Sequence, residues 1–389
     1  MASIYHPSPD SKQQCRSIAQ VHGVRHVAGD PAMVSLVDYE TEAERRLSPA
    51  AAAYYRSGAG DEQSLRENAE AWKRFRLLPR MLVGVGERNA ATTVLGAPVR
   101  FPVLLAPTAM QRLAHPDGEL ATARAAAAAG TIMTLSTVAT ASIEQVAEAR
   151  AAVAADSAGW FQLYPQRDRE LTRALVDRAA AAGYAAVVVT VDSPVFGHRE
   201  SDAREPLHLP EGLSLENFRG LPGYEERADL GILQRFIAQQ DPDFGWDDVA
   251  ALCDESPMPV ILKGILRGDD AERAAAAGAR AVIVSNHGGR QLDRAVAPAD
   301  ALRPVAEAAG DRVEVLADGG VRRGIDVLIA LALGARAVLI GRPVLWGLAV
   351  GGEAGVRAVL DLLAEDVDRA MALAGCRTVD EITADLLAG

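Results

Sequence analysis

The chain has 389 residues, of which 49% are hydrophobic and 24% are charged, a composition typical of globular proteins rather than of disordered ones. Its formal net charge of -12 opposes general attraction to nucleic acid or to anionic membranes, although a local cluster of arginines could still bind a small anion. The three cysteines are far apart and lack metal-site spacing, and no segment approaches the ~20 apolar residues of a membrane span, so we expect a cytoplasmic protein without disulfides, metal site or membrane anchor.

The N-terminal part of the chain differs in composition from the rest. Residues 1–33 are polar and mixed, and we expect an N-terminal extension that is either disordered or covers a neighbouring subunit. Two helical segments follow, at 36–47 and around 50–55. They predict a helical cap at the start of a main domain that extends over residues 34–389.

Short apolar segments rich in β-branched residues recur along this domain, separated by alanine-rich segments of helical character. A glycine often precedes the next strand, as at Gly130 and Gly334, where a left-handed residue can end a helix without a steric penalty. Repeated strand and helix units predict a parallel sheet, and eight units favour a closed (β/α)8 TIM barrel over an open doubly wound sheet. The expected strands are 101–106, 131–136, 160–164, 186–191, 260–263, 281–285, 313–317 and 337–340.

A long insertion separates the fourth and fifth expected strands. Residues 197–245 are rich in charged residues, proline and glycine and contain no apolar run. Insertions of this length in a compact domain are usually lids or binding loops. We therefore expect a lid after strand four.

The active site of such a barrel lies at the carboxyl ends of its strands, so polar residues there are the candidates. The turns after strands seven and eight, at 318–322 and 341–342, combine glycines with Arg322 and Arg342. Glycines allow close approach of backbone N–H groups and arginines add paired donors, which is typical of a phosphate site. Tight turns with solvated arginines are the alternative for either turn alone, and this alternative is weaker for both turns together.

Three further strand ends carry titratable side chains. His287 is the one histidine among seven in a glycine-flanked turn after a strand, and Asp192 could orient it, which indicates a general base. Lys263 ends strand five, where a positive charge would stabilise the reduced anion of an electron-accepting ring. A structural or solvated histidine, and a lysine that only extends to solvent, are the alternatives.

Seven motifs in one order resemble the FMN-dependent L-2-hydroxy acid oxidases and dehydrogenases, which include glycolate oxidase, lactate oxidase and mandelate dehydrogenase. A single Gly-Gly turn would be a weak signal, whereas seven linked motifs are specific. The resemblance covers about residues 34–382. The motifs lie at 54–59, 106–110, 161–164, 190–194, 262–264, 285–293 and 318–324.

The resemblance implies FMN as the cofactor and a small 2-hydroxy acid as the substrate. His287, paired with Asp192, resembles the base that takes either the C2 proton or the hydroxyl proton as hydride passes to the flavin. Lys263 resembles the residue on the N1 side of the flavin, where it favours the anionic reduced ring. Tyr164 completes the implied catalytic group.

The implied ligand contacts form two groups. Tyr54 and Arg290 resemble the pair that binds the substrate carboxylate, while Tyr164 and Arg199 resemble the groups at its other oxygens. The implied cofactor contacts comprise residues near the flavin ring and residues at the ribityl and phosphate site. They are Thr108, Ala109, Ser136, Gln162, Thr190, Lys263, Ser285, Asp318, Gly319, Gly320, Arg322, Gly341 and Arg342.

Two departures from the family pattern bear on the substrate and the electron acceptor. Val138 stands where the plant glycolate oxidase pattern has a tryptophan, which predicts room for a branched or aromatic substituent, and Phe196 is a second candidate wall residue. Ala109, rather than glycine, resembles the oxidases, which favours O2 as acceptor and H2O2 as product. A quinone or protein acceptor, another phosphate-binding barrel and a catalytically silent barrel are the alternatives. The family also implies a homo-oligomer, a tetramer or larger.

Overall fold

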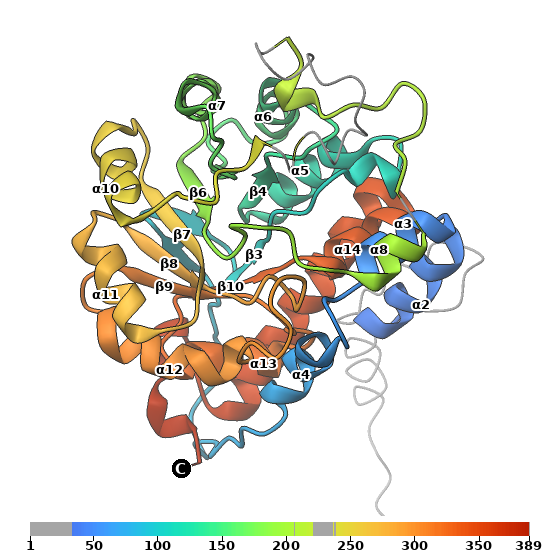
Figure 1. Cartoon of the computed structure of the whole chain (residues 1–389). Coiled ribbons are helices and arrows are strands. Elements are labelled where there is room, and N and C mark those ends of the chain that lie inside the picture. The colour runs from blue at the N-terminus through green and yellow to red at the C-terminus, as the bar shows by residue number, and fades with distance from the viewer. Residues whose placement is uncertain (1–32, 206, 221–235, 237–238, 389) are drawn as a thin grey trace, which may run out of the picture. The chain divides into compact units, whose positions relative to one another are not determined.

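The apolar segments form the parallel strands of a closed barrel in the computed structural model, which describes residues 33–205, 207–220, 236 and 239–388 (Figure 1). The strands pair in chain order around the ring, and the last pairs with the first. Nearly every strand residue is buried, as expected for parallel strands covered by helices on the outside. The eight strands are β3 (Val103–Leu105), β4 (Met133–Ser136), β5 (Gly159–Leu163), β6 (Ala186–Thr190), β7 (Val260–Ile265), β8 (Ala281–Val284), β9 (Glu314–Ala317) and β10 (Ala337–Ile340).

These strands confirm the predicted (β/α)8 barrel. Strand β3 is shorter than expected at both ends, β4 begins two residues later, and β7 continues to Ile265, two residues beyond the expected end at Lys263. A register shift between β7 and β8 accompanies this extension. Gly264, with φ 115°, allows the backbone to deviate at this point.

Helices cover the outer face of the barrel. Side-chain caps explain where several of them begin: Ser142 accepts from the N–H of Gln145, and Asp168 accepts from the N–H of Leu171. Short 3-10 helices lie at Gln111–Leu113, Glu216–Phe218, Val379–Glu381 and Ala384–Leu386. The outer helices are α5 (Gly118–Ala129), α6 (Ile143–Ala151), α7 (Arg169–Ala181), α10 (Trp246–Glu255), α11 (Gly268–Ala276), α12 (Pro298–Ala309), α13 (Gly324–Ala332) and α14 (Arg342–Ala374). The short helix α8 (Glu200–Arg204) lies in the insertion after β6 and packs against the helix Pro49–Arg56 of the N-terminal cap (Figure 1).

The N-terminal cap contains one helix more than the sequence predicts. Helices α2 (Leu36–Arg46) and α3 (Pro49–Arg56) match the prediction, and serines cap both of them. The unpredicted helix is α4 (Gln63–Trp72). Its N-cap, Glu62, is left-handed and makes no side-chain cap hydrogen bond, so the usual signal of a helix start is missing.

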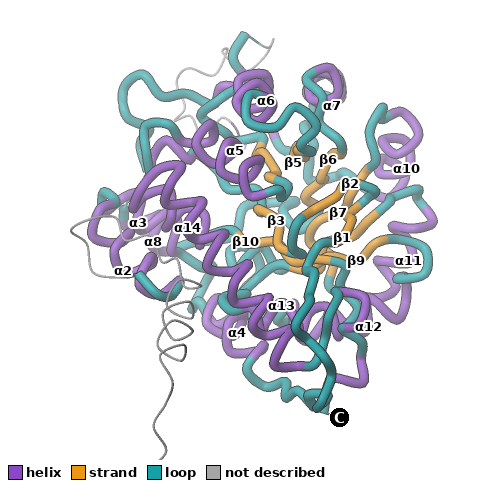
Figure 2. Tube along the Cα trace, turned by 180° about the vertical axis from the view of Figure 1, so that it is seen from behind, coloured by secondary structure: helices purple, strands orange, loops and turns teal. Residues whose placement is uncertain are grey.

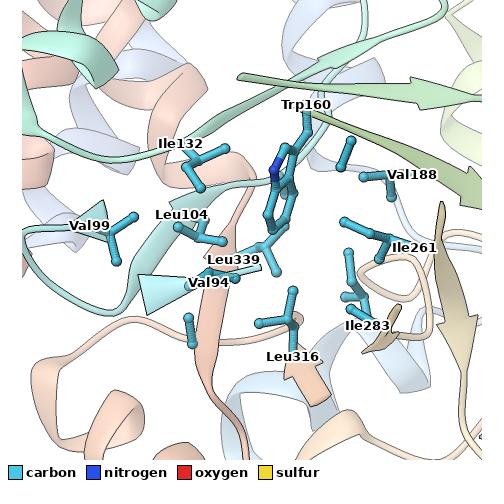
Figure 3. Close-up of a cluster of buried hydrophobic side chains, with 14 residues drawn as sticks. Val94, Val99, Leu104, Ile132, Trp160, Val188, Ile261, Ile283, Leu316 and Leu339 are labelled. Atoms are coloured by element: carbon cyan, nitrogen blue, oxygen red, sulfur yellow. The ribbon is translucent and has the colours of Figure 1, made fainter. Parts of the chain in front are cut away.

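A short hairpin covers the amino-terminal end of the barrel (Figure 2). Its antiparallel strands, β1 (Thr92–Val94) and β2 (Ala97–Val99), have only three residues each, which is why the sequence did not indicate them. Val94 and Val99 are buried in one cluster with Leu104 and Trp160, which belong to strands, and with Ile132, which directly precedes β4 (Figure 3). The hairpin therefore contributes to the core at the end of the barrel opposite the carboxyl ends of the strands.

Some expectations concern residues outside the described ranges. Residues 1–32 of the N-terminal extension lie there, as do 221–235 and 237–238 of the expected lid. Residues Ser35–Gly389 form one unit. In the described ranges, none of the helices is both long enough and apolar enough to cross a membrane.

Candidate active site

A cavity opens at the carboxyl ends of the strands, with a volume of about 1070 Å³ that includes space open to solvent. Three predicted residues, Gln162, Asp192 and Ser285, do not line it but bond to residues that do. The predicted residues that line it are Tyr54, Thr108, Ala109, Ser136, Val138, Tyr164, Thr190, Arg199, Lys263, His287, Arg290, Asp318, Gly319, Gly320, Arg322, Gly341 and Arg342. The fold thus brings the predicted residues together from many strand ends.

His287 occupies a left-handed turn after β8, with φ 59°. Its Nδ1 lies 2.8 Å from Oδ1 of Asp192, which follows β6. Asp192 Oδ1 also accepts a 2.9 Å hydrogen bond from the Ser193 hydroxyl. Because a carboxylate only accepts, Nδ1 carries the proton in the neutral ring and Nε2 is left as the basic nitrogen, 3.5 Å from the Tyr164 hydroxyl.

The electrostatics of this pair keep the imidazole neutral. Burial lowers the pKa of His287, and the charge of Lys263 lowers it further. The charge of Asp192 opposes both effects but does not outweigh them, so the pKa of His287 lies below its ordinary value. Burial acts to raise the pKa of Asp192, but the charge and hydrogen bond of His287 and the charge of Lys263 hold it below its ordinary value. At neutral pH the pair is therefore a carboxylate and a neutral imidazole, which can accept a proton at Nε2.

Lys263 is a buried cation at the end of the barrel interior. It is 4% exposed, forms a 3.0 Å ion pair with Asp318 and donates a 2.8 Å hydrogen bond to the Ser285 hydroxyl. Burial acts to lower the pKa of Lys263, but Asp318 and Asp192 raise it and the net direction is up, so the ammonium stays charged.

Several partly buried arginines make the same cavity strongly cationic. Burial and the charge of Arg199 lower the pKa of Arg290 to about 10. Burial and the charges of Arg290 and Arg322 lower the pKa of Arg342 to about 9. Both remain mostly protonated at neutral pH, and such a concentration of cations in a chain of net charge -12 indicates that the cavity binds anions.

The carboxyl end of α3 is fixed by two of these arginines. Arg290 donates to the carbonyls of Tyr54 and Ser57 at 2.7 and 2.8 Å. Arg342 donates to the carbonyls of Tyr55 and Ser57 at 2.9 and 3.0 Å. The last carbonyls of a helix have no partner within it and carry partial negative charge, so the arginines hold the cap on the strand ends.

The residues at the ends of β9 and β10 fit FMN. Asp318 Oδ1 is buried without a hydrogen-bond partner, so it offers an acceptor to a ligand hydroxyl at the cavity wall. Gly319 and Gly320 are both left-handed, and Arg322 and Arg342 lie beside them on the same wall. An acceptor for a polyol and two cations for a phosphate match the ribityl phosphate of this cofactor.

Comparison with known proteins gives the family. The chain matches the family described as FMN-dependent dehydrogenase over residues 43–389. The chain belongs to this family. The match confirms the predicted resemblance, the enzyme class and the FMN cofactor.

Several FMN-dependent relatives resemble the chain over almost their whole length. An L-lactate oxidase of Nostoc sp. is 53% identical over 357 residues, covering 91% of this chain and 98% of the relative. The 2-hydroxyacid oxidase 1 of Homo sapiens is 46% identical, covering 92% of this chain and 97% of the relative. A crystal structure of mandelate oxidase matches with a TM-score of 0.83 and 42% identity, covering 92% of this chain and 98% of that one.

The sequence did not single out several wall residues of this FMN-dependent enzyme. Phe196, whose role the sequence left open, lines the cavity, and the Arg199 guanidinium carbon lies 5.0 Å from its ring centroid. The remaining wall residues are mostly apolar or glycine and so carry no chemical signal of their own. They are Tyr55, Ala106, Pro107, Gly288, Val321, Leu339, Ile340 and Leu345.

Gly320→Ala is expected to impair both stability and FMN binding. A Cβ at Gly320 would lie 2.0 Å from the backbone oxygen of Asn68, at a residue with φ 83°. Gly183→Ala is the matched control, because Gly183 has φ 79° but no atom within 4 Å of the added carbon. Backbone strain alone costs about 1–3 kcal/mol, so denaturant unfolding and FMN content should show a larger loss for Gly320→Ala. Equal losses in the two variants would contradict the packing argument.

Proposed function

We propose that this enzyme oxidises an L-2-hydroxy acid to the 2-oxo acid and passes the two electrons to O2, giving H2O2. The observation that carries the proposal is the hydrogen-bonded His287–Asp192 pair in the same cavity as the half-buried Arg290. The pair supplies a base, and the arginine supplies a partner for a carboxylate. L-2-hydroxy acid plus O2 then gives 2-oxo acid plus H2O2.

Each substrate group has a partner in this arrangement. Arg290 and Tyr54 bind the carboxylate, and the arginine guanidinium already lies over the Tyr54 ring at 5.0 Å. His287 Nε2 accepts a proton, from C2 or from the hydroxyl, and Asp192 stabilises the imidazolium that results. Tyr164 and Arg199 line the same cavity and would contact the remaining oxygens of the substrate.

The cofactor contacts can likewise be assigned to separate parts of FMN. When bound, FMN accepts the two electrons that leave C2 of the substrate. Asp318, Gly319 and Gly320 would hold the ribityl chain, while Arg322, Gly341 and Arg342 would hold the phosphate. The ring would lie against Thr108, Ala109, Ser136, Thr190 and Lys263. Gln162 donates a hydrogen bond to Thr190, and Ser285 accepts one from Lys263, so both support residues that would contact the ring.

The proposed substrate carries a branched or aromatic group. Val138 and Phe196 both line the cavity. The backbone at Val138 is fixed by a hydrogen bond, in which its carbonyl accepts from the N–H of Met110 at 3.0 Å. A valine at this position leaves volume that an indole would fill. The substituent on C2 of the substrate would occupy that volume.

Val138→Trp is expected to shift selectivity toward small acids. The ratio of kcat/KM for mandelate to that for glycolate should fall by at least about tenfold, the lower end of what a change in pocket volume supplies. Val195→Trp, on a side chain that is 67% exposed, is the control and should leave this ratio unchanged. Steady-state assays with both acids provide the measurement, and an unchanged ratio in Val138→Trp would show that the substituent lies elsewhere.

An anaerobic spectral titration tests the proposed function directly. The purified holoenzyme is titrated with L-2-hydroxy acids from glycolate to mandelate, and air is then admitted. Bleaching by the larger acids followed by rapid recovery of colour supports an oxidase with an enlarged pocket. Slow recovery would favour a quinone or protein acceptor, and no bleaching by any acid would favour a catalytically silent barrel.

We further propose a cytoplasmic homo-oligomer, a tetramer or larger. Cys253 and Cys376 are unpaired thiols in the described part of the chain, which suits a reducing compartment. Light scattering of the purified protein measures the oligomeric state.

A further inference from the structure

A reciprocal pair of buried amides lies next to the catalytic turn. Asn68 Nδ2 donates to Asn286 Oδ1 at 2.8 Å, and Asn286 Nδ2 donates to Asn68 Oδ1 at 2.7 Å. Asn286 directly precedes His287, whereas Asn68 belongs to α4, which lies outside the ring of strands beside α12 and α13 (Figure 1). The two side chains are 4% and 2% exposed, so water does not replace either partner easily.

The Asn286 amide closes the turn that carries His287. Its Oδ1 also accepts from the N–H of Gly289 at 3.1 Å, and its Nδ2 also donates to the Val296 carbonyl at 3.3 Å. Within this turn His287, Gly288 and Gly289 are all left-handed, with φ of 59°, 66° and 76°. A left-handed histidine is strained and persists only where its surroundings hold it.

Helix α4 contacts the turn after β9 as well. A Cβ at Gly320 would lie 2.0 Å from the Asn68 backbone oxygen, and Trp72 Nε1 donates to the Gly319 carbonyl at 2.9 Å. A Cβ at Gly289 would lie 2.5 Å from the backbone nitrogen of Leu65. One helix of the cap is therefore packed against both the turn of the base and the glycine turn on the cofactor side.

We propose that Asn68 is a positioning residue for His287, acting through Asn286, and that α4 couples the orientation of the base to the glycine turn at the cofactor site. The inference rests on the proposed role of His287 as the base. Asn68 does not line the cavity and contacts no reacting group, so its effect is on geometry alone. Loss of the amide pair removes two of the four hydrogen bonds of the Asn286 side chain and lets the strained turn relax.

The test compares three variants of the holoenzyme. Asn68→Ala removes both hydrogen bonds; Asn68→Asp keeps the volume but cannot donate to Asn286 while ionised. Thr131→Val is the control, because it removes a buried 2.6 Å hydrogen bond to the Val103 carbonyl, near the amino ends of β3 and β4. FMN content, denaturant unfolding, and the stopped-flow rate of flavin reduction are measured with whichever acid reduces the wild-type enzyme.

We expect both Asn68 variants to bind FMN but to reduce it about 10- to 100-fold more slowly at saturating substrate, the size of effect that an error of ~1 Å in position produces. KM should change much less than this rate, and Thr131→Val should keep the wild-type rate despite lower stability. The rate should fall no further when Asn68→Ala is combined with Asn286→Ala than in Asn286→Ala alone.

Two results would overturn the inference. If both Asn68 variants reduce the flavin at a rate within twofold of wild type, the amide pair is a purely structural feature. The same conclusion follows if the losses of rate in Asn68→Ala and Asn286→Ala are fully additive in the double variant. A wild-type enzyme that no 2-hydroxy acid reduces would instead overturn the proposed function, and the inference with it. The wild-type titration therefore separates the two failures.

Discussion

His287→Ala is expected to slow flavin reduction by a 2-hydroxy acid about 10²- to 10⁴-fold, the contribution of a positioned general base, while FMN stays bound. The variant removes Nε2, the basic nitrogen in the cavity, but none of the side chains at the ends of β9 and β10. Anaerobic stopped-flow reduction measures the rate, and absorbance after gel filtration measures bound FMN. His208→Ala, at an exposed histidine outside the cavity wall, is the control.

The pH dependence of the same reaction gives a second signature of His287. The base must be neutral to accept a proton, and burial lowers the pKa of His287 below its ordinary value of 6.5. The charged and titratable groups facing it are Asp192, Lys263, Arg199 and Tyr164. The rate at low substrate concentration should therefore rise with pH through an apparent pKa below 6.5. This limb should be absent in His287→Ala; its persistence there would assign the base to another residue.

The barrel was predictable because each strand is a short apolar run that ends in polar or glycine residues. That pattern follows from burial on both faces and from the turn chemistry at the strand ends. The hairpin β1–β2 gave no such signal, because three residues per strand are too few to show a period. Helix α4 was missed for a different reason, since Glu62 begins it without a capping side chain.

The site was predictable as a set of residues but not as a set of pairs. His287 and Asp192 were paired from their places at strand ends, the family resemblance implied the same pair, and the structure places Nδ1 of His287 2.8 Å from Oδ1 of Asp192. Nothing in the spacing of Lys263 and Asp318 indicates their ion pair, because it depends on which strand ends meet across the closed barrel. Asn68 was not a candidate, since a lone asparagine inside a helix has no distinguishing pattern.

The Lys263–Asp318 pair allows stability and redox function to be separated. Lys263→Met leaves Asp318, which is 8% exposed, without its cation, and should lower the free energy of unfolding by about 3 kcal/mol or more, since breaking a buried ion pair leaves an uncompensated charge. Loss of a positive charge proposed to lie beside the flavin should also lower the flavin midpoint potential. Denaturant titration and a reductive dye titration measure the two quantities.

The double variant Lys263→Met with Asp318→Asn shows whether the lower stability and the lower midpoint potential have the same cause. It removes both charges, so no buried carboxylate is left unpaired and most of the lost stability should return. The midpoint potential should stay below the wild-type value, because the ammonium that is proposed to lie beside the flavin is still missing and the loss of the Asp318 charge offsets only part of its effect. If the potential returns fully to the wild-type value, the net charge of the Lys263–Asp318 pair, rather than the ammonium alone, sets the flavin potential. If it stays low in a stable protein, the positive charge itself favours the reduced flavin.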